Sequence, residues 1–168
     1  MTIAEFDHLP DDEKEMLLRQ CCGSSAWIKK MLSVLPAEDL IDLFEDAEEK
    51  WYECNEADWK EAFSHHPKIG DMRALKEKFA STANWAGEEQ SSINKASEQV
   101  LQSLAEGNKL YEEKFGYIFI VCATGRSPEE MLGLLTARLH NSREDEIKIA
   151  MEEQNKITKL RLEKLFTV

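Results

Sequence analysis

Apolar residues recur at helical spacing along almost the whole chain, a pattern that predicts a protein built from α-helices. Only seven Gly and four Pro are available to interrupt it. The fold class is therefore predicted to be all-α, a compact helical bundle in one domain over residues 1–168, with irregular loops. The expected helices cover about residues 11–22, 25–35, 37 to the break at Asn55, 58–64, a stretch from Asp71, 88–104, 128–141 and 143–165.

Two helix starts are marked by capping residues. Ser127 can cap a helix, Pro128 suits its first position, and Glu130 can complete a capping box. Ser142 with Asp145 three residues later predicts the start of the last helix in the same way. Along that last helix the apolar positions predict a buried stripe made of Ile147, Ala150, Met151, Ile157, Leu160 and Leu165.

Two stretches do not fit the helical pattern. In residues 64–71, Pro67 disfavours a helical conformation for His66, and Gly70 permits a turn. Residues 115–126 form an aromatic and β-branched run between glycines. An extended segment inside a helical protein has backbone groups available for a ligand, so we expect the site in these irregular stretches.

Charge and composition exclude several classes of protein. The 33 acidic residues against 21 basic ones give a net charge of −12, which disfavours a nucleic-acid binder. The sequence shows no secretory signal, no apolar stretch long enough to cross a membrane and no peroxisomal address at its end. The four cysteines form no metal-ligand spacing, so reduced thiols and a cytoplasmic location are expected.

Several residues have a functional and a structural interpretation. His66 suits an acid or base aimed into a cleft, or a residue that packs a helix end. Glu88 and Glu89 either belong to a functional site or simply stabilise the dipole at the start of a helix. Arg126 precedes a helix N-terminus, where it either binds a carboxylate of a ligand or is an ordinary surface arginine. No metal site is expected, because His65 points away from His66 in an extended pair.

The ordered motifs of the chain resemble the OHCU decarboxylase family. They are 65-HHPKIGD-71, Glu89-Gln90, 115-FGYIFIVCA-123 with Arg126, 138-RLHN-141 and the stretch 152–162. The resemblance implies an all-α, cofactor-independent homodimer that converts 2-oxo-4-hydroxy-4-carboxy-5-ureidoimidazoline (OHCU) into S-allantoin and carbon dioxide. The substrate would be a small molecule, with neither nucleic acid nor membrane as a partner.

The same resemblance implies roles for individual residues. His66 would be the catalytic acid and Glu89 its catalytic partner. One position departs from the family's Ser-x-x-Glu-Gln pattern, because Ala86 replaces the serine. The remaining residues implied to bind substrate are Pro67, Ala86, Gly87, Glu88, Gln90, Phe119, Ile120, Val121, Cys122, Ala123 and Arg126.

Chemistry supports the expectation that no cofactor is needed. Loss of carbon dioxide beside a C=N bond leaves an electron pair that the substrate ring accepts. The protein would then supply orientation and one proton. Because the net charge is negative, Lys68, Arg73 and Arg126 are expected to form a locally positive cleft mouth for the anion. Two alternatives stay open: an acidic helical protein-interaction module, or a lyase for a different small ureido compound.

Overall fold

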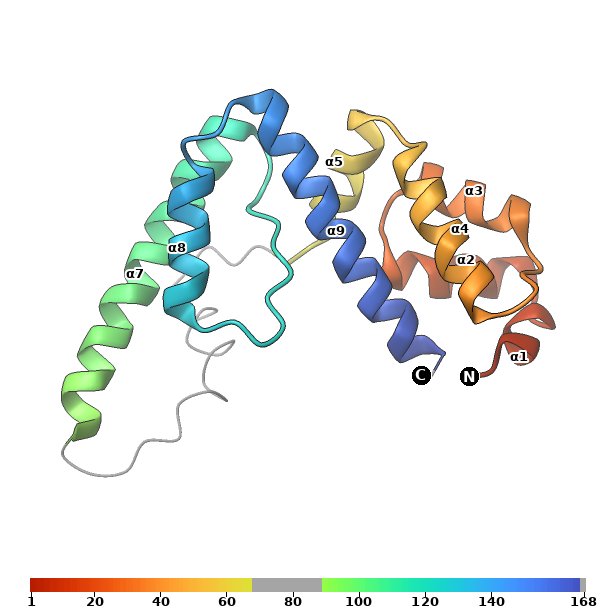
Figure 1. Cartoon of the computed structure of the whole chain (residues 1–168), viewed down its shortest axis with the longest axis horizontal. Helices are drawn as coiled ribbons and strands as arrows, with labels where there is room; N and C mark the ends of the chain where they lie inside the picture. Colours follow the sequence, from red (N-terminus) through yellow and green to blue (C-terminus); the bar gives the residue numbers. More distant parts are fainter. Residues whose placement is uncertain (68–88, 167–168) are drawn as a thin grey trace. The chain divides into compact units, whose positions relative to one another are not determined.

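The computed structural model describes residues 1–67 and 89–166, with side chains from residue 98 onward in the second range (Figure 1). Its regular secondary structure in these ranges consists of helices, and they contain no strand. This confirms the predicted fold class. The described helices are α1 (Ile3–Asp7), α2 (Asp11–Cys21), α3 (Ser25–Val34), α4 (Leu40–Tyr52), α5 (Glu56–Ser64), α7 (Glu89–Phe115), α8 (Pro128–Arg138) and α9 (Arg143–Leu165).

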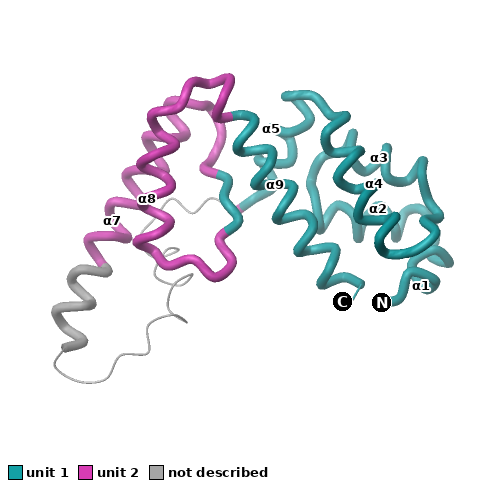
Figure 2. Tube along the Cα trace, in the orientation of Figure 1, with its two compact units in different colours: residues 1–66, 120–122, 147–168 teal, residues 67–119, 123–146 magenta. Residues whose placement is uncertain are grey.

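The chain divides into two compact units, coloured separately in Figure 2. Unit 1 contains residues 1–66, 120–122 and 147–168, and unit 2 contains residues 67–119 and 123–146. Unit 1 therefore holds α1 to α5 and most of α9, whereas unit 2 holds α7 and α8, which pack together. The single-domain organisation stays a prediction of the sequence.

Capping side chains set the observed helix boundaries. Ser127 accepts a hydrogen bond from the backbone N–H of Glu130 at 3.1 Å, as predicted for the start of α8. The expected helix from Ala37 begins instead at Leu40, because the Asp39 carboxylate accepts from two backbone N–H groups of the first turn. Asn55 likewise starts α5 at Glu56, two residues before the predicted start. The short helix α1 was not predicted.

The core of unit 1 is organised by aromatic side chains. The indole N–H of Trp27 donates to the carbonyl of Ala47 at 2.9 Å, so it links α3 to α4. The indole N–H of Trp51 donates to the carbonyl of Met151 at 2.8 Å, so it links α4 to α9. Both side chains are almost completely buried. Burial of such large rings with their N–H groups satisfied fixes α9 against the N-terminal helices.

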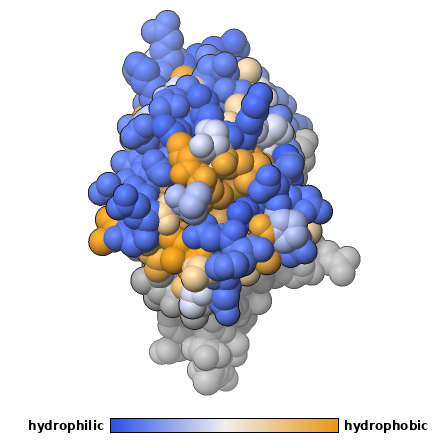
Figure 3. All heavy atoms as spheres, turned by 90° about the vertical axis from the view of Figure 1, so that its right-hand side faces the viewer, coloured by the Kyte–Doolittle hydropathy of each residue, from blue (hydrophilic) through white to orange (hydrophobic). Residues whose placement is uncertain are grey.

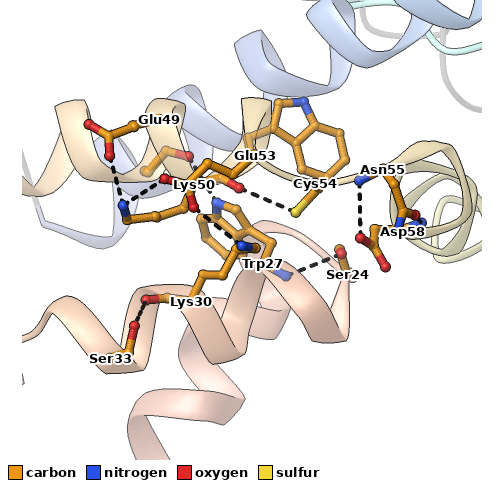
Figure 4. A network of polar contacts seen from close by, with 12 residues as sticks. Ser24, Trp27, Lys30, Ser33, Glu49, Lys50, Glu53, Cys54, Asn55 and Asp58 are labelled. Carbon is orange, nitrogen blue, oxygen red and sulfur yellow. Dashed lines mark hydrogen bonds and ion pairs between the residues drawn. The ribbon is translucent and has the colours of Figure 1, made fainter.

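Polar contacts join α3 to the C-terminal end of α4, next to the Asn55–Asp58 contact that caps α5 (Figure 4). Lys50 donates to Glu49 at 2.7 Å and to Glu53 at 3.0 Å, and Glu53 also accepts from Lys30 of α3 at 3.2 Å. Ser24 caps α3 by accepting from the backbone N–H of Trp27. These ion pairs lie at the surface end of α4 and add little stability individually, and the start of α5 is set separately by the Asn55 cap.

Three of the four cysteines lie in the interior of unit 1. Cys21, Cys22 and Cys54 have exposed fractions of 3%, 0% and 6%, and all four cysteines have free thiols. Burial raises the pKa of Cys21 and of Cys54 to about 11, and that of Cys22 to about 12. These thiols are therefore protonated at neutral pH and chemically unreactive. Cys122 is only half-buried.

The surface of unit 1 is not uniformly polar. One face carries an apolar area surrounded by hydrophilic side chains (Figure 3). Large apolar residues of this unit with high exposure include Ile41 at 68%, Met16 at 56% and Tyr52 at 48%. Among the described helices, none combines the length and apolar character needed to span a bilayer.

Candidate active site

His66 lies immediately after the C-terminal end of α5. The backbone N–H of His65 donates to the carbonyl of Ala62, and that of His66 donates to the carbonyl of Phe63, each at 3.2 Å. His65 is the C-cap, and its ring lies against Gly23, where a Cβ atom would be 2.4 Å from the histidine Cγ. Only glycine permits this approach, so α5 can end with its C-cap residue against the α2–α3 connection.

The imidazole of His66 contacts a buried amide of α9. Its Nε2 atom lies 2.5 Å from Oε1 of Gln154, whose own Nε2 donates to Oγ1 of Thr158 at 3.1 Å. Gln154 is 0% exposed and Thr158 is 4% exposed. The Thr158 hydroxyl is in turn a hydrogen-bond partner of the Cys22 thiol. A line of buried polar groups therefore begins at the half-buried His66 and ends inside unit 1.

This arrangement changes the buried stripe predicted for the last helix. Ile147, Ala150 and Met151 are buried as expected, but Ile157, Leu160 and Leu165 are only half-buried. The face continues instead through a mixed set, Gln154, Thr158, Leu162 and Phe166. These positions follow Met151 at the helical repeat, and two of them are polar because their side chains hydrogen-bond one another and His66.

The second irregular stretch lies outside the helices, as the sequence predicts. Residues 118–123 adopt neither helix nor strand, and glycines flank the stretch at Gly116 and Gly125, with φ values of 84° and 75°. Those left-handed conformations favour glycine and turn the chain at both ends of the segment. Ile120 is 3% exposed, so its side chain anchors the segment.

A buried ion pair in unit 2 holds the beginning of this segment. Arg138 donates from Nε and Nη2 to Oε1 of Glu146, at 2.8 and 2.5 Å, and the Tyr111 hydroxyl donates to the same oxygen. Asn141 donates to the other oxygen, Oε2, at 2.9 Å. The Arg138 guanidinium lies 4.5 Å from the ring centroid of Phe119. Burial and the bond to Glu146 raise the pKa of Tyr111.

The structure describes some of the remaining predicted residues fully, some only in their backbone and others not at all. Arg126 is half-buried, and its backbone N–H donates to the carbonyl of Ala123 at 3.1 Å. Glu89 and Gln90 open α7, and their side chains lie outside the described part of the structure. The residues Lys68, Arg73, Ala86, Gly87 and Glu88 lie outside it altogether, as does the expected helix from Asp71.

The predicted residues are distributed over both units. Unit 1 contains His66, Ile120, Val121 and Cys122. Unit 2 contains the exposed Pro67 together with Glu89, Gln90, Phe119, Ala123 and Arg126.

The structure brings His66 together with two residues that the sequence did not predict, Gln154 and Thr158. Their signal in the sequence is the pair of polar residues four apart on a helix face that is otherwise apolar.

Unit 1 also contains a groove of about 740 Å³ between α4 and α9. Its apolar lining includes Phe44 and Leu162. Four carboxylates also line it, those of Glu45, Glu48, Glu49 and Glu53. These carboxylates repel an anion such as the expected substrate, so the groove is a poor substrate site.

Within the described ranges, no cluster of three or more His, Cys, Asp or Glu could hold a metal ion.

The protein is thus a helical protein with two distinctive features. A buried amide contacts the histidine His66, and glycines bound an irregular segment. The chain belongs to the OHCU decarboxylase family, because the model of that family matches residues 7–163. This confirms the resemblance found in the sequence.

Curated relatives support the same family. The chain is 41% identical over 150 residues to the "Uric acid degradation bifunctional protein TTL" of Arabidopsis thaliana, covering 88% of this chain and 45% of that protein. It is 22% identical over 168 residues to the "2-oxo-4-hydroxy-4-carboxy-5-ureidoimidazoline decarboxylase" of Haloferax volcanii, covering 99% and 97%. The chain thus spans less than half of its Arabidopsis relative and nearly all of its Haloferax relative.

Solved structures have the same fold. A crystal structure of OHCU decarboxylase in the presence of (S)-allantoin matches with a TM-score of 0.73 and 38% identity, over 95% of this chain and 100% of that one. A crystal structure of (S)-allantoin synthase matches with a TM-score of 0.70 and 16% identity, over 96% and 53%, which supports the fold alone.

Proposed function

We propose that this protein decarboxylates OHCU to S-allantoin and carbon dioxide in urate degradation, with His66 as the general acid. The observation that carries the proposal is the family match over residues 7–163. It is supported by the position of His66, which follows α5 and is held by the buried Gln154 rather than packed as an inert helix end.

The proposed reaction needs little from the protein beyond orientation and one proton. The bond between the ring carbon and its carboxylate breaks, carbon dioxide leaves, and the electron pair passes into the adjacent C=N system. A proton from His66 then reaches one face of the ring and sets the stereocentre. Since the ring itself accepts the electron pair, we propose that no cofactor takes part.

We propose that the other predicted residues hold the substrate. Glu89 acts with His66 at the reacting groups, and Gln90 binds the ureido or ring amides. The backbone of residues 119–123 supplies further polar contacts, which is consistent with a segment that forms neither helix nor strand. Arg126 binds a carboxylate. Pro67 and residues 86–88 complete the lining.

The decisive experiment generates the unstable substrate OHCU within the assay mixture itself. Urate oxidase and hydroxyisourate hydrolase convert urate to OHCU, this protein is added, and circular dichroism follows the chiral product. We expect the S-allantoin signal to appear at a rate proportional to the concentration of this protein. Racemic product at the spontaneous rate would contradict the proposal and favour the interaction module. A lyase for another ureido compound would be indicated by turnover of that compound alone.

We also propose that the protein is a homodimer, as the family resemblance implies. Sedimentation velocity over a hundredfold range of protein concentration should give a species of twice the chain mass of 19.3 kDa. A monomer throughout that range would contradict the dimer and leave the proposed reaction untouched. The cytoplasmic location stays a prediction of the sequence.

A further inference from the structure

The amide of Gln154 occupies an unusual position, because it is completely buried and both of its ends have partners. Its oxygen faces Nε2 of His66 at 2.5 Å, and its nitrogen donates to the Thr158 hydroxyl at 3.1 Å. A buried amide is expensive unless its hydrogen bonds are made. A methionine or leucine would fill this position in α9 without that requirement. The amide therefore calls for an explanation beyond packing.

The chemistry of imidazole decides which end of the amide must face the histidine. A protonated imidazole has two N–H donors and no acceptor. When His66 is protonated and able to act as an acid, its Nε2–H can donate a hydrogen bond only to the oxygen of Gln154, and not to its NH₂ group. The hydroxyl of Thr158 fits the same orientation, because it accepts from the amide nitrogen and can donate towards the Cys22 sulfur.

We propose that Gln154 is a positioning residue that keeps one proton on Nε2 of His66 throughout the reaction, so that the proton given to the substrate leaves from Nδ1. This inference rests on the proposed function. Thr158 is the second part of the device, since its hydroxyl oxygen accepts from the amide nitrogen and so favours this orientation of the amide. A hydrogen bond to one ring nitrogen selects the tautomer and directs the other nitrogen to the chemistry.

The proton balance of the step is simple. The protonated ring releases its Nδ1 proton to the ureido-bearing carbon of the former C=N bond, and it becomes neutral with the Nε2–H bond to Gln154 intact. The carbon that has lost carbon dioxide becomes the carbonyl of the product, because its hydroxyl proton moves to the ring nitrogen of the former C=N bond. A proton from water then returns to Nδ1. The amide therefore keeps the same orientation in both protonation states of His66, and no buried group has to reorganise during turnover.

The tautomer can be measured without any substrate. In protein labelled with ¹⁵N-histidine, long-range ¹H–¹⁵N correlation spectra distinguish the two neutral tautomers, and the His66 signals are those absent from His66→Asn. We expect the neutral His66 ring to carry its proton on Nε2. A ring protonated on Nδ1 in the wild-type protein would overturn the inference, whatever the variants do.

Variants test the link to catalysis. Gln154→Met preserves the length of the side chain without an acceptor, and Thr158→Val removes the hydroxyl that orients the amide. For both we expect a mixture of tautomers and, for Gln154→Met, a loss of about tenfold in kcat with little change in KM. Asn155→Met is the matched control, because Asn155 bonds to Glu48 rather than to His66, and it should keep the wild-type tautomer and kcat.

The outcomes separate the two proposals. If His66→Asn retains full turnover, the proposed role of His66 fails, whichever tautomer is found. If His66 is required but folded Gln154→Met keeps both the Nε2–H tautomer and kcat, the positioning role fails and the proposed function stands. Should Gln154→Met not fold, the wild-type tautomer and the Thr158→Val variant still decide the question.

Discussion

Replacement of His66 by asparagine is expected to lower kcat/KM for OHCU decarboxylation by at least about a hundredfold, with the remaining product formed in racemic form. General acid catalysis by a positioned side chain contributes about 10²–10⁴-fold. Asparagine keeps a polar side chain at this half-buried position, but it is too short to replace Nε2 at Gln154, and its amide cannot deliver a proton at neutral pH. The loss should therefore appear without a loss of folded protein.

The measurement is the rate of the circular dichroism signal of S-allantoin with OHCU generated from urate. His65→Asn is the matched control, because His65 is adjacent and exposed and its Nδ1 contacts the backbone carbonyl of Glu61 at 3.0 Å. That control should retain most of the activity. Full turnover in folded His66→Asn would remove His66 from the mechanism.

Arg138→Met is expected to lower the free energy of unfolding by about 3–5 kcal/mol, the range observed when one partner of a buried ion pair is removed. Glu146 is 0% exposed, and Arg138 supplies the only positive charge among its described partners. Without the guanidinium, the carboxylate stays in the interior with only the Tyr111 hydroxyl and the Asn141 amide as donors. Phe119 also loses the cation above its ring.

Urea denaturation followed by circular dichroism measures this loss. Arg143→Met is the control, because Arg143 is exposed in the first turn of α9, and its stability should change by no more than about 0.5 kcal/mol. Adding Glu146→Leu to Arg138→Met should restore part of the stability, since it removes the uncompensated charge. Equal stability of Arg138→Met and the wild type would show that the ion pair is not needed in the folded state.

Local signals in the sequence explain the part of the fold that could be predicted. Ser127 and Pro128 determine where α8 begins through contacts within one turn, so the start is visible in four residues. The same holds for the glycines that bound the irregular segment. By contrast, the buried pair between Arg138 at the end of α8 and Glu146 of α9 joins two helices, and no local rule contains that contact.

The candidate site was predicted only in part for a similar reason. The position of His66 followed from its place before a proline, but its partner lies 88 residues away on α9. Gln154 and Thr158 follow Met151 at helical spacing, but because they are polar, a search for apolar positions does not select them. Only the folded structure shows that they replace apolar residues in the interior because each makes a hydrogen bond. The roles of Glu89 and Gln90 stay predictions.

The distribution of the cysteines has a practical consequence for spectroscopy. Thiol reagents attack the thiolate, and Cys21, Cys22 and Cys54 are both buried and held protonated at neutral pH. Cys122 is the most accessible of the four, and it lies in the irregular segment that we propose to bind substrate. The chain thus carries a selective attachment point for a fluorophore or spin label, which would report ligand occupancy if the proposed site is correct.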